Sequence, residues 1–216
     1  MSKYEFILFD FDGTIVDTGE GILKSIEYAL TSLNYPVNSK DELKKFIGPP
    51  LVVSFREFCH FNEEQIEKAV SLYRERYNKK GLYEISKYKD LENLLIKLKD
   101  ENKKIILATS KPEDFAIAIL KNVDLYKYFD FIAGSTLDGK RNNKTKVIDY
   151  AIKNMNITDI SKAIMIGDRK FDIEGANNFN MDSIGVLYGY GSYNELSKAG
   201  ATYIKRTPMD IYEILK

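Results

Sequence analysis

Two aspartates stand two positions apart near the start of the chain, directly behind an apolar run. The stretch FDFDGTIVDT, residues 9–18, contains Asp10 and Asp12, and the run before them is Phe6 to Phe9. Carboxylates repel one another and resist the loss of their hydration, so a pair at the end of a buried segment needs compensating positive charge. The first question is therefore what neutralises these two groups.

Other polar residues follow three later apolar runs in the same way. They are two hydroxyls, two cations and two further carboxylates: Thr109 and Ser110, Arg141 and Lys144, and Asp168 and Asp172. Carboxylates gathered without histidine suit a hard, oxygen-seeking cation such as Mg²⁺. A metal, a lysine and a hydroxyl together suit a phosphoryl group, whose developing charge needs electrostatic stabilisation. In such a site Asp10 is a candidate nucleophile, and Asp12 is close enough to give and take protons.

The elements that must bring these residues together read as a parallel sheet with helices. Short apolar runs predict buried strands at residues 6–9, 105–108, 129–133, 163–166 and 184–187, and helical patterns separate the later runs. Strands that alternate with helices indicate βαβ units. The predicted fold class is therefore α/β, with a Rossmann-like doubly wound parallel sheet. Because the carboxyl ends of parallel strands share one edge of the sheet, the polar residues are expected to converge there.

Between the first two predicted strands the sequence reads only as helices. Apolar residues recur at helical spacing from Ile22 to Leu33, and the capping signals SKDE and NEEQ begin two further helices. We predict an α/β core domain formed by residues 1–15 and 87–216 and an inserted α-helical cap domain formed by residues 16–86. Cys59 and His60 lie in the aromatic stretch FREFCHF of this insertion, and both are expected to pack in its core.

Composition argues against several kinds of site. Among 216 residues, 32 Lys plus Arg balance 32 Asp plus Glu, so neither a nucleic acid polymer nor a membrane surface is expected as a partner. A single cysteine rules out an intramolecular disulfide and a cysteine metal cluster. A single histidine leaves little for a zinc site or a Ser-His-Asp triad. We see neither a signal peptide nor a stretch of about 20 apolar residues, so a cytoplasmic location is expected.

Taken together, the motifs resemble those of the haloacid dehalogenase superfamily of phosphotransferases. DFDGTIVDT resembles its first motif, Thr109 in ILATSKP its second, Lys144 its third and GDRKFD its fourth, in the family's order along the chain. The helical insertion resembles the small cap of the phosphoglycolate phosphatase-like branch. FIGPPL, ATSKP, GDRKFDIEGA and SIGVLYGYGS are similar to a 5′-nucleotidase-like subgroup.

The resemblance implies a catalytic role for four residues. Asp10 would attack phosphorus and also bind Mg²⁺. Asp12 would be the general acid and base and would offer its backbone carbonyl to the metal. Thr109 would hydrogen-bond a phosphoryl oxygen, and Lys144 would neutralise the transferring group and steady Asp10. The reaction implied is hydrolysis of a phosphate monoester through an aspartyl-phosphate.

The resemblance also implies metal and substrate contacts. Asp168 would ligate Mg²⁺, and Asp172 would support the metal directly or through water. Six further positions are candidates for substrate binding: Thr14, Ser110, Gly48, Pro49, Arg56 and Arg141. The expected partner is a small phosphorylated metabolite, first a nucleoside 5′-monophosphate and second phosphoglycolate or another small phosphate ester. A monomer or a weak homodimer is expected.

Some of these residues also have purely structural interpretations. Thr109 could be the N-cap of the helix that follows it. Asp172 could be an acidic first-turn residue opposite the helix dipole, and Arg56 could be a surface charge. Lys144 is one of several nearby cations, with Lys140, Arg141 and Lys146.

Two other functions stay open as alternatives. A sugar phosphomutase of the same fold would pass the phosphoryl group between sugar hydroxyls, although Thr14 mildly disfavours it. A non-catalytic protein that binds a phosphorylated ligand could dispense with Asp12 or Lys144, and both are present.

Overall fold

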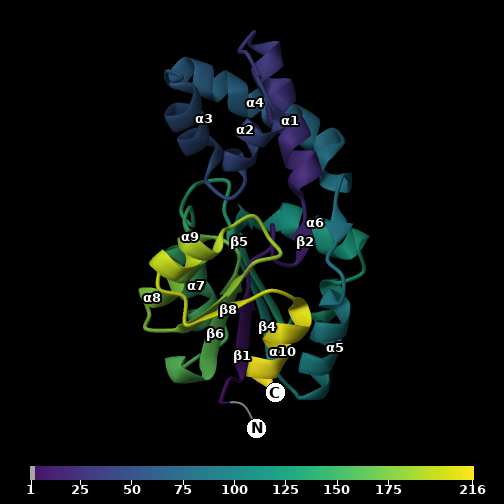
Figure 1. Ribbon diagram of the computed structural model, residues 1–216, viewed down its shortest axis with the longest axis vertical. Helices are drawn as coiled ribbons and strands as arrows, with labels where there is room; N and C mark the ends of the chain where they lie inside the picture. Colours follow the sequence, from purple (N-terminus) through teal and green to yellow (C-terminus); the bar gives the residue numbers. More distant parts are fainter. Residues whose placement is uncertain (1–2) are drawn as a thin grey trace. The chain divides into compact units, whose positions relative to one another are not determined.

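The computed structural model describes residues 3–216, and its largest element is a parallel sheet of six strands. The strands lie in the order β5-β4-β1-β6-β7-β8, and all neighbours are parallel. Their bounds are β1 (Phe6–Phe9), β4 (Lys104–Pro112), β5 (Phe131–Ser135), β6 (Ala163–Gly167), β7 (Asp182–Val186) and β8 (Tyr203–Lys205). Helices flank both faces, which confirms the predicted α/β class (Figure 1).

Helices of this sheet cover its two faces in pairs. α7 (Lys144–Asn154) and α8 (Lys170–Asn177) pack together on one face, and α5 (Leu91–Asp100) and α10 (Pro208–Leu215) pack together on the other (Figure 1). α6 (Glu113–Asn122) packs on β4 and β5, and α9 (Tyr193–Lys198) packs on α8 and β8. Short 3₁₀ turns, η3 (Tyr126–Tyr128) and η4 (Ile160–Lys162), precede β5 and β6. Because helices cover both faces, the central strands are apolar throughout rather than alternating.

Strand boundaries differ from the prediction in several places: β4 continues to Pro112 rather than ending at residue 108, and β7 begins at Asp182 rather than at residue 184. β5 begins at Phe131 rather than at residue 129, because Asp130 ends the preceding segment by bonding to Ile105. Its backbone N–H donates to the Ile105 carbonyl and its carboxylate accepts from the Ile105 N–H, both at 2.8 Å. The prediction also missed β8, a short and only half-buried edge strand that carries no apolar run.

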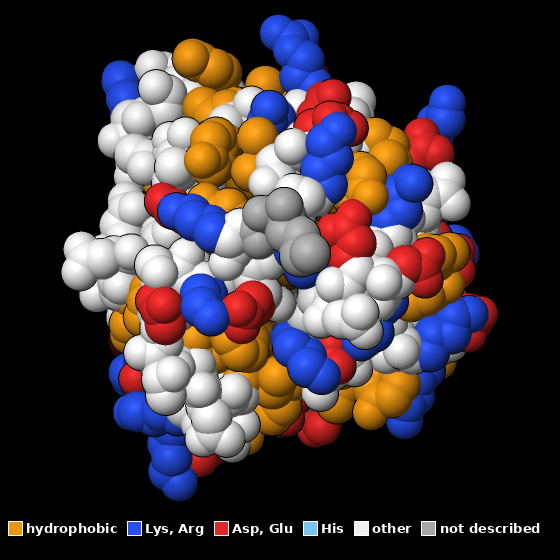
Figure 2. Space-filling model, turned by 90° about the horizontal axis from the view of Figure 1, so that it is seen from below, with side chains coloured by type: hydrophobic (Ala, Val, Ile, Leu, Met, Phe, Trp, Pro, Cys, Tyr) orange, Lys and Arg blue, Asp and Glu red, His pale blue; other side chains and the backbone are white. Residues whose placement is uncertain are grey.

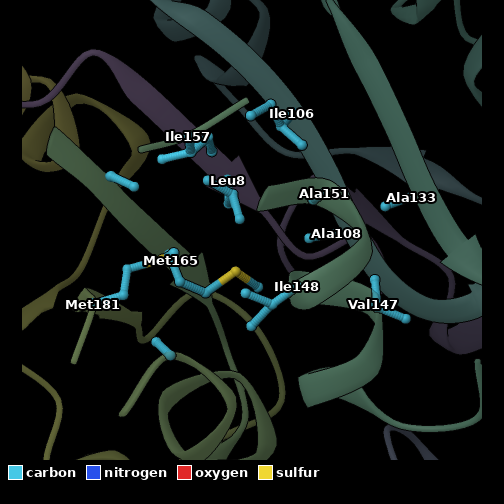
Figure 3. Packing of buried hydrophobic residues seen from close by; sticks show 12 residues of the cluster. Leu8, Ile106, Ala108, Ala133, Val147, Ile148, Ala151, Ile157, Met165 and Met181 are labelled. Atoms are coloured by element: carbon cyan, nitrogen blue, oxygen red, sulfur yellow. The ribbon is translucent and has the colours of Figure 1, made fainter. Parts of the chain in front are cut away.

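The core holds the strand ends in place. Leu8, Ile106 and Met165, from three adjacent strands, pack against Ile148 and its neighbours on α7 (Figure 3). All four side chains are fully buried. Burial of one such side chain contributes about 1.5–3 kcal/mol, so the strands that carry polar residues at their ends are held rigidly.

The chain forms two compact units. One comprises the described residues up to Val16 together with Lys87–Lys216, and the other comprises Asp17–Ser86. Strands β2 (Val16–Asp17) and β3 (Ser86–Lys87) pair in a two-stranded sheet, and the boundary between the units falls within it. The first unit contains the parallel sheet.

The second unit is helical. It contains α1 (Gly19–Ser32), α2 (Lys40–Leu43), η1 (Lys44–Phe46), α3 (Leu51–Cys59), α4 (Glu63–Lys79) and η2 (Gly81–Tyr83). Asn62 and Gln65 form the capping box that NEEQ predicts. Cys59 is buried as expected, but the prediction for His60 is wrong. His60 ends α3 with a left-handed φ of 55°, and this turn exposes its side chain.

The surface carries mixed charge. Figure 2 shows Lys, Arg, Asp and Glu side chains interspersed over the face seen from below the view of Figure 1. Ion pairs on the surface include Lys3 with Asp182 and Lys162 with Glu5. Within residues 3–216, no helix is both long enough and apolar enough to cross a membrane.

Candidate active site

The carboxyl ends of the three central strands bring the first and fourth motifs side by side. β1 lies between β4 and β6, with Phe9 opposite Leu107 on one side and Ile166 on the other. Asp10 follows β1 directly, and its backbone N–H donates to the Ile166 carbonyl at 2.8 Å. Asp168 follows β6 in the same way. The register of the sheet therefore places Asp10 next to Asp168, although 158 positions separate them in the chain by their numbers.

Three carboxylates form a buried group at this edge. Asp10, Asp168 and Asp172 each offer an oxygen within 4.8 Å of the others. Lys144, at the start of α7, enters the group with an exposure of 6%. Its ammonium lies 2.6 Å from Asp10 Oδ1 and 2.7 Å from Asp172 Oδ1, and it donates to the Ala108 carbonyl at 2.9 Å. One ammonium thus contacts two of the three carboxylates.

The electrostatics of the group show a deficit of positive charge. Burial raises the pKa of Asp10 from 3.8 to about 6, with a further contribution from the charge of Asp172, against the opposing pull of Lys144. Burial, followed by the charges of Asp172 and Asp10, raises the pKa of Asp168 well above its usual value. Burial alone would lower the pKa of Lys144, but the two carboxylates that it contacts raise it instead.

A divalent cation fits this deficit. The donors are carboxylate oxygens, which suit a hard cation such as Mg²⁺. Asp172 has both oxygens engaged, one with the Lys144 ammonium and one with the Arg169 N–H at 3.0 Å. This arrangement suits Asp172 to an outer, supporting position and leaves Asp10 and Asp168 as the candidate inner donors. Asp172 is also the N3 residue of α8, so its first-turn position and its place in the group coexist.

Asp12 does not join the carboxylate group. Its carboxylate contacts the ammonium of Lys111 through both oxygens, at 3.0 and 3.2 Å. The sequence reasoning missed Lys111 as a site residue. No local pattern could have found it, because the pairing of β4 shifts register between Ala108 and Pro112, so the regular alternation of side chains does not hold there.

The loop after Asp12 packs closely on Asp168. Thr14 is fully buried, and its hydroxyl donates to Asp168 Oδ1 at 3.4 Å. Gly13 has a φ of 85°, and a Cβ there would lie 2.3 Å from Asp168 Oδ2. The structure therefore places Thr14, a predicted substrate-binding residue, against a carboxylate of the buried group. Glycine at position 13 is required by both the backbone conformation and the close approach.

A glycine-rich loop after β7 also contacts Asp168. The Tyr190 N–H donates to Asp168 Oδ2 at 2.8 Å, and the Tyr188 hydroxyl donates to the Thr14 carbonyl at 3.1 Å. A Cβ at Gly191 would lie 1.8 Å from the Asp168 carbonyl oxygen, so only glycine permits this approach. Sequence reasoning assigned no site role to this loop, although its alternating glycines in YGYGS were visible.

The second motif lies at the end of β4. Thr109 is buried, and its hydroxyl oxygen accepts the Lys111 N–H at 3.1 Å. α6 begins at Glu113 with Pro112 at its N-cap, so the alternative that Thr109 caps this helix is wrong. Ser110, the next residue, is half-buried.

Among the cations of the third motif, only Lys144 enters the carboxylate group. Lys140 and Lys146 are exposed. The Arg141 guanidinium donates to the Gly134 carbonyl at 2.9 Å and to Glu113 at 2.7 Å, and it lies 3.8 Å from the centre of the Tyr150 ring. These partners tie Arg141, another predicted substrate contact, to β5 and α6.

The remaining predicted substrate contacts belong to the helical unit. Gly48 is exposed with a φ of 106°, and Pro49 is half-buried beside it. Arg56 is exposed on α3 and forms an ion pair with Glu63 at 2.7 Å. The surface-charge interpretation of Arg56 agrees with this contact.

Comparison with known proteins agrees with the geometry. The sequence model of the haloacid dehalogenase-like hydrolase family matches residues 7–186. The chain is 38% identical over 194 residues to a 5′-nucleotidase of Pseudomonas aeruginosa, which covers 90% of this chain and 87% of that protein. It is 30% identical over 200 residues to the tyrosine-protein kinase PtkA of Mycobacterium tuberculosis, covering 93% of this chain and 68% of that protein.

A solved structure extends the comparison to three dimensions. The crystal structure of a "predicted phosphatase" from Clostridium acetobutylicum shares 45% identity and a TM-score of 0.93, with 97% of each chain covered. The match spans both compact units of the chain described above. The chain therefore belongs to the haloacid dehalogenase-like hydrolase family, as a phosphatase that hydrolyses phosphate monoesters.

Proposed function

We propose that this phosphatase acts through an aspartyl-phosphate on Asp10 and that its substrates are nucleoside 5′-monophosphates. One observation carries the mechanism. Asp10 is fixed at the end of the central strand, and the Lys144 ammonium holds one of its oxygens at 2.6 Å. The other oxygen is the candidate nucleophile.

The proposed reaction has two steps. In the first, the Asp10 oxygen attacks phosphorus, and the bond to the alcohol oxygen breaks as Asp12 gives that oxygen a proton. In the second, Asp12 takes a proton from water as the water attacks phosphorus, and the bond to Asp10 breaks to release inorganic phosphate. The net reaction converts ester and water into alcohol and phosphate.

We assign two further side chains to the phosphoryl group. The hydroxyl oxygen of Thr109 already accepts the Lys111 N–H. We therefore propose that the Thr109 hydroxyl donates its hydrogen bond to a phosphoryl oxygen. Lys144 is assigned to neutralise charge on the transferring group. Mg²⁺, held by Asp10 and Asp168 with support from Asp172 and the Asp12 carbonyl, would supply further positive charge there.

Similarity supports the substrate proposal. The relative from Pseudomonas aeruginosa is named a 5′-nucleotidase and matches nearly the full chain. We propose that the helical unit Asp17–Ser86 is the cap domain expected from the sequence, and that Gly48, Pro49 and Arg56 help to select the substrate. Phosphoglycolate or another small ester is the second choice.

A panel of phosphate esters assayed with Mg²⁺ tests the substrate. It should include nucleoside 5′-monophosphates, 2-phosphoglycolate, hexose phosphates and p-nitrophenyl phosphate. We expect the highest kcat/KM for a nucleoside 5′-monophosphate. A higher value for phosphoglycolate, or equal values throughout, would overturn the substrate proposal.

Substitution of the nucleophile tests the mechanism. Asp10→Asn should abolish release of phosphate, because an amide cannot accept the phosphoryl group. Asp182→Asn is the matched control, since this aspartate begins β7 and bonds to Lys3 and Tyr4. Near-normal turnover of p-nitrophenyl phosphate by Asp10→Asn would contradict the aspartyl-phosphate mechanism.

The similarity to PtkA favours one alternative, transfer of the phosphoryl group to tyrosine instead of water. Incubation with ATP, followed by analysis for phosphotyrosine, separates the two. Phosphotyrosine without release of phosphate from any monoester would favour the kinase. Isomerisation of a hexose 1-phosphate without net phosphate release would instead favour the mutase.

A further inference from the structure

Lys111 is a buried lysine at the end of β4. It is 8% exposed, in a strand whose preceding residues from Ile105 to Ala108 are all fully buried. An ammonium in such a place loses its contacts with water, and a partner of opposite charge must compensate for that loss. The mechanism proposed above gives Lys111 no role, so its position needs an explanation.

An irregularity in β4 aims this side chain. The pairing of β4 with β5 shifts register between Ala108 and Pro112, and two additional residues of β4 lie in that interval. The Thr109 hydroxyl accepts the Lys111 N–H at 3.1 Å and so closes a tight turn within the irregular segment. Irregular strand ends of this kind commonly redirect a side chain beside an active site.

The redirected side chain ends on Asp12. The Lys111 Nζ lies 3.0 Å from one Asp12 oxygen and 3.2 Å from the other, and 5.8 Å from the centre of the buried Phe11 ring. A cation that contacts both oxygens restrains rotation of the carboxylate about its own axis. Among the residues that the structure describes, the carboxylates grouped closely enough to hold a metal ion are those of Asp10, Asp168 and Asp172, and Asp12 lies outside that group.

We propose that Lys111 is a positioning residue that holds the Asp12 carboxylate in the orientation from which it activates water against the aspartyl-phosphate. This inference rests on the proposed function, since it requires an aspartyl-phosphate on Asp10. Lys111 exchanges no atoms in the reaction. It keeps Asp12 from turning toward the neighbouring carboxylate group or toward solvent.

The two steps depend differently on this orientation. p-Nitrophenolate is a good leaving group and departs without a proton, so formation of the phosphoenzyme from p-nitrophenyl phosphate needs little from Asp12. Hydrolysis of the phosphoenzyme needs a base held against the attacking water, and a small displacement of such a base costs rate steeply. Loss of Lys111 should therefore slow the second step selectively.

The test is rapid-mixing kinetics of Lys111→Met with p-nitrophenyl phosphate and Mg²⁺. We expect hydrolysis of the phosphoenzyme to fall about tenfold to a hundredfold, while its formation changes by less than about threefold. The trace should then show a burst of nitrophenolate stoichiometric with the enzyme, and acid quenching should recover phosphate on the protein. Lys111→Arg, which can contact both oxygens through its planar fork, should restore part of the second step. Equal slowing of both steps, or slowing of neither, would overturn the inference.

Lys103 provides a matched control. It has the same exposure, 8%, and lies in the same unit, but its ammonium donates to the Tyr4 carbonyl at 2.8 Å. Lys103→Met also loses a buried ammonium, and it should leave the ratio of the two rates unchanged. If Lys111→Met does not fold, Lys111→Gln is judged by the same ratio. Turnover by Asp10→Asn would show that the proposed function itself is wrong, whereas an inactive Asp10→Asn with an unchanged ratio in the Lys111 variants would reject only this inference.

Discussion

The raised pKa of Asp10 predicts how the stability of the metal-free protein depends on pH. An acid whose pKa is higher in the folded protein than in the unfolded chain binds its proton more tightly when folded. Its stabilising effect is therefore complete below the unfolded pKa and is lost as the pH rises through the folded one. For Asp10 these values are 3.8 and about 6. Asp168 titrates in the same direction.

The size of the effect follows from the difference between the two values. A pKa that differs by about two corresponds to about 3 kcal/mol of unfolding free energy. For a chain of this length that is about 6–12 °C in Tm. Asp130 and Asp182 have lowered pKa values and contribute stability that grows with pH, so wild type alone would mix opposite trends. Asp10→Asn cannot ionise at position 10 but keeps Asp130 and Asp182. The difference in stability between wild type and this variant therefore largely cancels the contributions of those two residues.

Thermal unfolding of the two proteins in a chelator, between about pH 4 and about pH 7, measures the effect. We expect wild type to lose about 3 kcal/mol relative to Asp10→Asn over this range. Mg²⁺ at about 100 times its Kd adds about 2.7 kcal/mol to a protein that binds it, so it should close most of the gap for wild type. If the difference in unfolding free energy between wild type and Asp10→Asn does not change with pH in the chelator, the electrostatic account of the buried group is refuted. If Mg²⁺ leaves that difference unchanged, the metal site is refuted.

Three further perturbations test other parts of the structure. Lys144→Met strips the ammonium from two buried carboxylates, so urea unfolding should show a loss of about 3–5 kcal/mol, together with loss of turnover; normal values of both would contradict the pairing. Gly191→Ala brings a Cβ within 1.8 Å of the Asp168 carbonyl oxygen and should lower Mg²⁺-dependent activity strongly. Gly139→Ala is the control, because a Cβ at this position, with a φ of 76°, meets open space. It should cost only about 1–2 kcal/mol of stability and retain activity. Equal activities of Gly191→Ala and Gly139→Ala would show that the loop after β7 does not hold Asp168. Asn62→Ala removes the capping box of α4 and should cost about 1 kcal/mol, and an unchanged urea midpoint would show that this cap does not limit stability.

The gathering of the charged groups could largely be predicted from the sequence because it depends on local patterns and on the rules of parallel sheets. The apolar run before Asp10 identifies a buried strand, and parallel strands must present their carboxyl ends at one edge. That rule alone brings Asp168 next to Asp10, and the structure places Lys144 between Asp10 and Asp172. The capping box at Asn62 is equally local, because its two partners are three residues apart.

The partners of individual side chains were decided only by the tertiary structure. Lys111 and Asp12 are 99 positions apart, and their contact depends on an irregularity in β4 that no local pattern announces. The N–H of Tyr190 reaches Asp168 only because a glycine loop can approach to a distance that no side chain would permit. Strand identity follows from the periodicity of nearby residues, whereas these contacts follow from register and loop path. The sequence by itself thus determined which groups gather at the edge of the sheet, and the packing of distant segments decided which group holds which.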